Sequence, residues 1–213
     1  MFVRLFLNKL LHIILNILRG STKSMSRRKP KIIDRIIPVN PFSRPGRKLV
    51  SVKGIVVHWV AWPNASGERI YEYFRDLSKQ TQGASGVRYA STHYTVGLDG
   101  EILRHLPDDE IAYHVGAHEY MPGILERFNT TWPNNCLLGI EMCHPDNTGK
   151  FNDKTRQSTI ELISYLIQSY DLTTDDIVRH YDVTGKNCPK YFVEREDEYK
   201  KFVQDVERHI KRR

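Results

Sequence analysis

The stretch KGIVVHWV (53–60) decides the fold, because its β-branched run has the composition of a buried β-strand. A second stretch, CLLGIEMC (136–143), predicts another buried strand. Between and after these strands, residues 67–80 and 153–170 place apolar side chains at helical spacing. Strands that alternate with helices predict an α/β fold: a single domain with a central mixed β-sheet flanked by helices.

Shorter patterns extend this fold along the chain. The sequence THYTVGLDGEILRHL (92–106) is typical of a β-hairpin, with an Asp-Gly turn between two alternating strands. DIVRHYDV (176–183) predicts a strand followed by a loop, and residues 194–210 predict a C-terminal helix. The side chains expected on the inward faces of the two long helices are Ile70, Tyr73, Phe74, Leu77, Ile160, Ile163, Leu166 and Ile167.

The first 19 residues, MFVRLFLNKLLHIILNILR, have polar positions at helical spacing and predict an amphipathic helix. Their charges make a transmembrane span a poor interpretation, since about 20 mostly uncharged residues are needed to cross a bilayer. Three interpretations of residues 1–24 stay open: an export signal, a helix on a membrane surface, or a segment upstream of a true start at Met25.

The formal charge of +7 is concentrated near the N-terminus, because residues 1–48 contain a single acid, Asp34. We divide the chain into a segment and basic linker (1–35), a folded domain (36–193) and a C-terminal helix (194–213). Much of the basicity lies outside the folded domain, so we expect no nucleic-acid partner. An anionic wall polymer or a membrane surface fits the basic segment better.

The three cysteines do not form a disulfide framework. Cys136 and Cys143 flank a predicted strand, and seven extended residues span roughly 23 Å, far more than a disulfide can bridge. Each cysteine, Cys188 included, is therefore expected to be free or bound to a metal.

Three residues have the types and positions of a catalytic zinc site. His58 ends a buried strand, and His180 and Cys188 lie in HYDVTGKNCP, where Gly185 and Pro189 allow the loop to fold back. Two imidazoles and a thiolate leave the fourth position of a tetrahedral zinc ion open for water. Taken alone, a strand histidine or a single cysteine is more often a structural residue.

An acid in the apolar strand LLGIEMC is the second chemical feature. Gly139, Glu141 and Cys143 share one face of this strand, because side chains alternate along it. A buried carboxyl is costly unless it faces a polar cavity or an ion partner. Glu141 therefore has two interpretations: a general base beside the metal, or one member of a buried ion pair.

Five stretches in this order resemble the type 2 N-acetylmuramoyl-L-alanine amidases, the group that includes many phage endolysins, Bacillus-type autolysins and peptidoglycan recognition proteins. The stretches are IPVNPFSRPG (37–46), GIVVHWV (54–60), STHYTVGLDGEILRHLPDDEIAYHVG (91–116), LLGIEMC (137–143) and VRHYDVTGKNCP (178–189). The resemblance implies an enzyme that uses Zn²⁺ to hydrolyse the amide between the muramic acid lactyl group and L-alanine in peptidoglycan. It also implies the cell wall as an extracellular site of action.

Carried over residue by residue, the resemblance implies that His58, His180 and Cys188 hold the zinc ion. It implies Glu141 as the catalytic acid–base group and Lys186 as the group that stabilises the oxyanion of the tetrahedral intermediate.

Two other histidines match family positions. His114, in AYHVG, is expected to line the groove and bind the substrate, and His93 is expected to pack or hydrogen-bond within the domain. Thr92 stands where some relatives have a catalytic tyrosine, so that role is expected to fall to Glu141.

The segment 117–135 is longer than the resemblance predicts, and its aromatic residues either stack on sugar faces or pack internally. These residues are Tyr120, Phe128 and Trp132.

Two rival functions fit much of the same pattern. A non-catalytic peptidoglycan-binding protein of the same fold is one, although retention of Cys188 as a third ligand favours catalysis. A zinc amidase for a different amide is the other. The chain is expected to reach the wall either through a signal-like N-terminus or through release by a phage.

Overall fold

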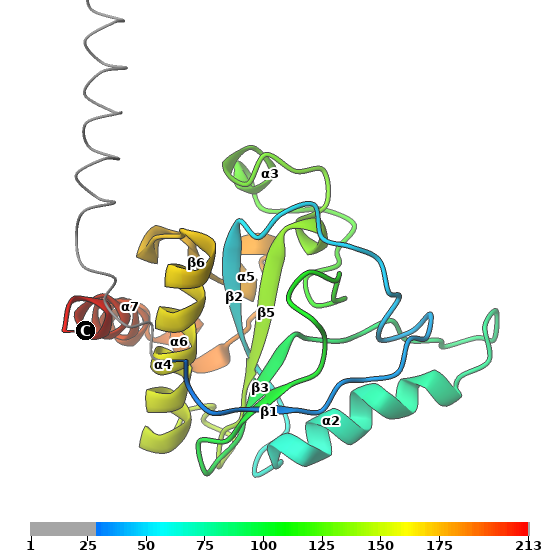
Figure 1. The fold of residues 1–213 in the computed structure, drawn as a ribbon, viewed down its shortest axis with the longest axis horizontal. Helices are drawn as coiled ribbons and strands as arrows, with labels where there is room; N and C mark the ends of the chain where they lie inside the picture. The colour runs from blue at the N-terminus through cyan, green and yellow to red at the C-terminus, as the bar shows by residue number, and fades with distance from the viewer. Residues whose placement is uncertain (1–28, 213) are drawn as a thin grey trace, which may run out of the picture.

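A computed structural model describes residues 29–212, and within this range six strands form one sheet in the order β1-β4-β3-β5-β2-β6 (Figure 1). Their bounds are β1 (Ile32–Asp34), β2 (Gly54–Trp59), β3 (Tyr94–Val96), β4 (Ile102–Arg104), β5 (Leu137–Met142) and β6 (Ile177–Arg179). Strands β3, β5, β2 and β6 run parallel, whereas β4 is antiparallel to β3 and parallel to β1. The sheet is therefore mixed, as the sequence predicted.

The helices cover the sheet from both sides. Their bounds are α2 (Gly67–Asp76), η1 (Leu77–Lys79), α3 (Ile124–Arg127), η2 (Pro133–Asn135), α4 (Asp153–Tyr170), η3 (Thr174–Asp176), α5 (His180–Thr184), α6 (Lys190–Glu194) and α7 (Glu196–Lys211). Helices α4, α6 and α7 lie on one side of the sheet and α2 lies on the other (Figure 1). The predicted α/β architecture, with helices flanking a central sheet, is confirmed.

Alternation along the two central strands decides which side chains are free for chemistry. Ile55 and Val57 of β2, with Ile140 of β5, enter the large core shared with α4 and α7. Residues one position along point to the opposite face, where His58 and Glu141 lie side by side in register. Both polar side chains therefore avoid the main apolar core.

Helix α4 begins and ends where the sequence predicted. Its first turn is capped by the Asn152 side chain, which accepts a hydrogen bond from the Thr155 N–H at 2.8 Å. The predicted inward residues of α4 are all buried, and Phe202 and Val206 of α7 are buried in the same core. The C-terminal helix thus shares its core with the sheet.

Two local features differ from the sequence prediction. Strand β1 lies in the predicted basic linker, where it pairs with β4 through backbone hydrogen bonds that side-chain patterns do not reveal. The loop predicted in the second half of 176–183 is instead helix α5, whose first turn is capped because the Asp182 carboxylate accepts a hydrogen bond from the Arg179 N–H at 2.8 Å. The domain limits at 36–193 stay a prediction.

The predicted amphipathic helix over residues 1–19 lies outside the described residues. Between residues 29 and 212, no helix is long and apolar enough to cross a membrane. Cys136, Cys143 and Cys188 are all buried, and none of the three forms a disulfide, as predicted.

Candidate metal centre and substrate groove

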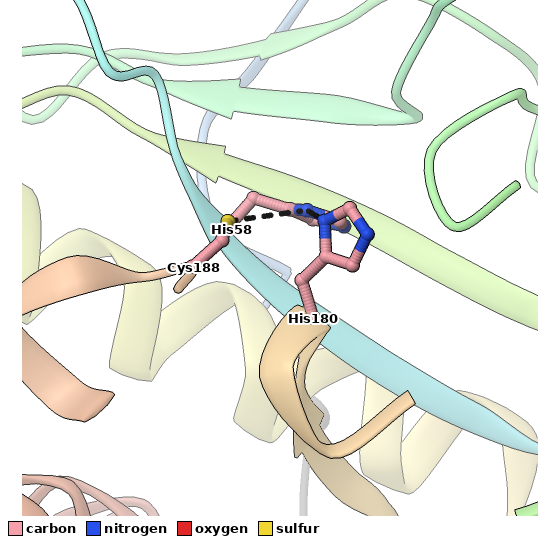
Figure 2. Close-up of side chains that lie close together, drawn as sticks. All are labelled: His58, His180 and Cys188. Atoms are coloured by element: carbon pink, nitrogen blue, oxygen red, sulfur yellow. Dashed lines mark hydrogen bonds between the residues drawn. The ribbon is translucent and has the colours of Figure 1, made fainter. Parts of the chain in front are cut away.

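Three separate elements bring the predicted metal ligands together. His58 is the next-to-last residue of β2, His180 is the first residue of α5 directly after β6, and Cys188 follows α5. Because β2 and β6 are neighbouring parallel strands, their carboxyl ends meet at one edge of the sheet. The three side chains converge there (Figure 2).

The distances within the cluster suit a tetrahedral zinc ion. His58 Nδ1 lies 3.1 Å from His180 Nδ1 and 3.8 Å from Cys188 Sγ, and all three atoms lie within 4.8 Å of one another. Zinc–nitrogen bonds of about 2.0 Å and zinc–sulfur bonds of about 2.3 Å at tetrahedral angles separate two nitrogens by about 3.3 Å. They separate nitrogen and sulfur by about 3.5 Å. The residues present therefore fit this ion in both donor type and spacing.

The loop between His180 and Cys188 folds back on itself. The Tyr181 N–H donates to the Cys188 carbonyl at 2.9 Å, and the Gly185 N–H donates to the Tyr181 carbonyl at 2.8 Å. Gly185 ends α5 at a φ of 77°, a left-handed conformation that strains other residues. These contacts hold the thiol beside the imidazole.

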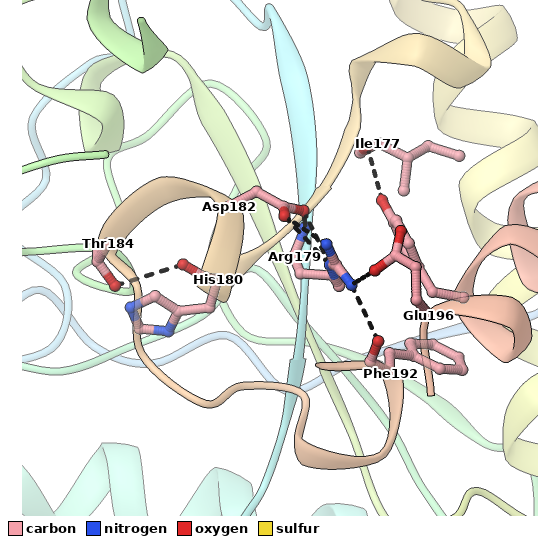
Figure 3. Close-up of polar contacts among 8 residues, drawn as sticks. Ile177, Arg179, His180, Asp182, Thr184, Phe192 and Glu196 are labelled. Carbon is pink, nitrogen blue, oxygen red and sulfur yellow. Dashed lines mark hydrogen bonds and ion pairs between the residues drawn. The ribbon is translucent and has the colours of Figure 1, made fainter. Parts of the chain in front are cut away.

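A buried arginine next to His180 fixes the elements around the loop (Figure 3). The Arg179 guanidinium binds the Asp182 carboxylate at 2.7 Å, the Phe192 carbonyl at 3.0 Å and the Glu196 carboxylate. It thereby ties α5 to α6 and α7. Sequence reasoning missed this residue, although a charged side chain within the apolar strand pattern Ile-Val-Arg was a signal for it.

Burial sets the protonation states within the cluster. Burial lowers the pKa of His58 well below its usual value, and the neighbouring His180 and His114 add to this effect. Burial also lowers the pKa of His180 to about 4 and raises that of the Cys188 thiol to about 12. Neutral imidazoles offer lone pairs to a metal ion, and a divalent cation would favour the thiolate.

Glu141 has the environment of a functional acid. Its Oε2 atom is buried and has no hydrogen-bond partner among the described residues. Burial raises the pKa of this carboxyl to about 8, against the opposing charge of Lys186. Of the two interpretations from sequence, the buried ion pair therefore lacks its partner, whereas the role of a base beside a metal remains.

A groove of about 450 Å³ opens beside the cluster. It is lined by Tyr89, Ala90, Tyr113, His114, Gly116, Trp132, Asn134, His180 and Lys186. A larger hollow of about 620 Å³ lies near the amino ends of β2 and β5, where it is lined by Lys53 and Cys136 among others. Only the smaller groove contains a member of the metal cluster.

The aromatic residues of the segment 117–135 lie in two different environments. Phe128 is buried, and Tyr120 packs against the same apolar cluster. Trp132 instead lines the groove, 6.3 Å from the Tyr113 ring and beneath the Arg47 guanidinium. Trp132 is therefore the one of the three that lines the groove.

The two other histidines that match family positions, His93 and His114, have partners within the protein. His93 accepts a hydrogen bond from the Gly139 N–H at 3.0 Å and contacts the Glu110 carbonyl at 2.9 Å, which confirms the predicted structural role. His114 lines the groove, and its Nδ1 atom is 3.0 Å from His58 Nε2. Its predicted contact with substrate stays a prediction.

Known proteins match most of the length of this chain. The sequence model of a family described as N-acetylmuramoyl-L-alanine amidase matches residues 48–191. A Bacillus licheniformis protein named "Probable N-acetylmuramoyl-L-alanine amidase" is 40% identical over 168 residues, covering 76% of this chain and 43% of the relative. N-acetylmuramoyl-L-alanine amidase BlyA of Bacillus subtilis (strain 168) is 33% identical over 176 residues, with coverages of 80% and 45%. The chain therefore spans less than half the length of these relatives.

Solved structures share the fold. A mutant endolysin from Bacillus subtilis aligns with a TM-score of 0.62 at 26% identity, covering 84% of this chain and 99% of that one. The PlyG catalytic domain aligns with a TM-score of 0.64 at 17% identity, covering 85% and 96%. The described domain thus corresponds to nearly the whole of each of these two chains.

Proposed function

Because the chain belongs to the N-acetylmuramoyl-L-alanine amidase family, we propose that it is a zinc-dependent hydrolase of peptidoglycan. The bond cut is the amide between the muramic acid lactyl group and L-alanine. The cell wall is the site of action and peptidoglycan the partner. The basic segment 1–35 adds affinity for an anionic wall polymer or membrane surface, and no nucleic acid takes part.

The observation that carries the proposal is the convergence of His58, His180 and Cys188 beside Glu141, at the edge of a groove. Two neutral imidazoles and a thiol within 4.8 Å of one another are a donor set that zinc prefers. A bound zinc ion would polarise the scissile carbonyl and lower the pKa of a water molecule toward about 7.

Glu141 supplies proton transfer in this scheme. Its unpartnered Oε2 atom accepts a proton from the attacking water and later returns it to the leaving alanine nitrogen. The raised pKa of this carboxyl suits both steps, because an acid–base group works best when its pKa lies near the working pH.

Lys186, which also lines the groove, supplies positive charge. Its ammonium group stabilises the oxyanion that forms when water attacks the amide carbonyl. Its charge lowers the pKa of His58, of His180 and of Glu141, which supports this proposed role. Trp132 offers a flat apolar face at the groove wall for the sugar or lactyl part of the substrate.

The test is digestion of purified peptidoglycan followed by mass spectrometry of the products. We expect free stem peptides that begin with L-alanine, together with uncut glycan strands. Products cut within the glycan or between stem residues would overturn the proposal.

Two further measurements address the rival functions. Sedimentation with insoluble peptidoglycan in the absence of any new amine would identify a non-catalytic binder. Equal rates on peptidoglycan and on a simple acyl-alanine would identify an amidase for a different amide.

A further inference from the structure

A chain of hydrogen bonds leads from the backbone of β5 to the metal cluster. His114 Nε2 lies 3.0 Å from the Leu137 carbonyl oxygen, and His114 Nδ1 lies 3.0 Å from His58 Nε2. The other nitrogen of His58, Nδ1, faces His180 Nδ1 at 3.1 Å. The His114 ring therefore stands between one backbone carbonyl and a member of the cluster, His58.

The donor and acceptor in each of these hydrogen bonds follow from the Leu137 carbonyl at one end of the series. A carbonyl oxygen can only accept, so His114 Nε2 must carry a proton and donate it to Leu137. A neutral imidazole protonated at Nε2 presents a lone pair at Nδ1, which accepts from the N–H at His58 Nε2. His58 is then unprotonated at Nδ1, the atom that faces His180 and Cys188.

We propose that His114 is a positioning residue that holds His58 in the tautomer and ring orientation in which Nδ1 binds the metal ion. This inference rests on the proposed zinc site. Both ring nitrogens of His114 already have partners in the protein, so its effect on the metal passes through His58.

Two further residues, Gly139 and Asn134, make room for His114 and hold it. A Cβ atom at Gly139 would lie 2.7 Å from His114 Cγ, so the strand needs glycine at this position for the ring to fit. The Asn134 side chain accepts hydrogen bonds from the N–H groups of His114 at 3.2 Å and Val115 at 3.0 Å. The His114 ring is therefore held in place by the Asn134 contact to its backbone and by close packing against Gly139 of β5.

The first test compares zinc affinities by competition with a chromophoric chelator. His114→Phe keeps a flat ring but removes both nitrogens, and we expect zinc to bind about 10–100-fold more weakly. His114→Gln keeps one donor and one acceptor, so we expect most of the affinity to return. The matched control is His105→Gln, a change at another buried histidine that contacts Thr95 and should leave the affinity unchanged.

The second test reads the tautomers directly, by ¹⁵N NMR of the zinc-loaded wild-type protein. We expect protons at Nε2 of both His114 and His58, and metal bonding at Nδ1 of His58. A proton at His114 Nδ1 would overturn the inference even if the variants failed to fold.

The zinc measurements separate this inference from the proposed function. Wild-type affinity in His114→Phe, or equal losses in the Phe and Gln variants, would reject the positioning role and leave the zinc site intact. A wild-type chain that binds no zinc would reject both.

Discussion

Two groups of buried histidines lie on the same sheet, and they differ in their partners rather than in their burial. Beside β3 and β4, His93 binds backbone groups of Gly139 and Glu110, and His105 binds the Thr95 hydroxyl. At the carboxyl ends of β2 and β6, His58 and His180 instead face each other and a thiol. Burial lowers the pKa of all four histidines. A lowered pKa therefore does not distinguish a metal site from a structural histidine, whereas convergence of lone pairs is the feature on which the proposed zinc site rests.

Two glutamates differ in the same way, one having partners within the protein and the other having a side-chain oxygen without one. Glu110 is buried but forms two hydrogen bonds with the Arg44 guanidinium, at 2.8 and 2.9 Å. Glu141 has a buried oxygen with no partner among the described residues. One acid is part of the scaffold, and the other is available for chemistry.

The largest expected effect is at Glu141. Glu141→Gln keeps the shape of the side chain but cannot accept a proton, so turnover of purified peptidoglycan should fall by about 10²–10⁴ with zinc retained. The matched control is Glu110→Gln, which should lower stability but not the rate per folded molecule. A near-normal rate in Glu141→Gln would mean that another group is the base.

Lys186 comes next. Lys186→Ala removes the charge expected to stabilise the oxyanion and should lower kcat by about 10²–10³ with little change in zinc content. Lys190→Ala is the control, because the Lys190 ammonium contacts the Asn147 carbonyl at 3.1 Å and has no assigned part in the reaction. Equal activities of the two variants would remove Lys186 from the scheme.

Protonation of His105, a buried histidine outside the metal cluster, should affect how the stability of the protein depends on pH. Burial lowers the pKa of His105 from 6.5 to about 4, so the folded state disfavours its proton. The contribution of His105 is then fully present above pH 6.5 and is lost as the pH falls from 6.5 through 4.

The His105→Gln variant has no titratable group at this position. Between pH 7 and pH 4 its unfolding free energy should therefore fall less than that of the wild type, by on the order of 3 kcal/mol. Urea unfolding at both pH values measures this difference, and parallel losses in the two proteins would contradict it.

The smallest effect on hydrolysis is expected from the segment that the structure does not describe. Deletion of residues 1–24 should leave hydrolysis of isolated peptidoglycan nearly unchanged, because every proposed site residue follows residue 57. In cells the same deletion should reduce the amount of membrane-associated or exported protein. Lost hydrolysis in a folded truncated chain would place this segment in the catalytic unit. Unchanged location would favour Met25 as the start.

Local patterns predicted the parts of the fold that depend on local energetics. The bounds of α4 and the strand character of β2 and β5 follow from side-chain periodicity, which reflects burial on one or both faces. Strand β1 escaped prediction because its evidence is pairing with β4, a contact between distant parts of the chain.

The site was predictable only in part, for the same reason. Strand ends and loop composition pointed to His58, His180 and Cys188, and an acid within an apolar strand pointed to Glu141. The family resemblance chose between the two interpretations of Glu141 and added Lys186. The contact between His114 and His58 spans 56 residues and depends on the absence of a side chain at Gly139. Contacts between residues this far apart in the sequence can be recognised only from the three-dimensional arrangement of the strands.

Zinc content in a pair of cysteine variants tests the central claim most directly. Cys136 and Cys188 are both buried free thiols, but only Cys188 lies with His58 and His180. The purified wild-type chain and Cys136→Ser should each contain close to one zinc ion, and Cys188→Ser should lose most of it. Equal zinc contents in the two variants would contradict the assignment of His58, His180 and Cys188 as the metal centre.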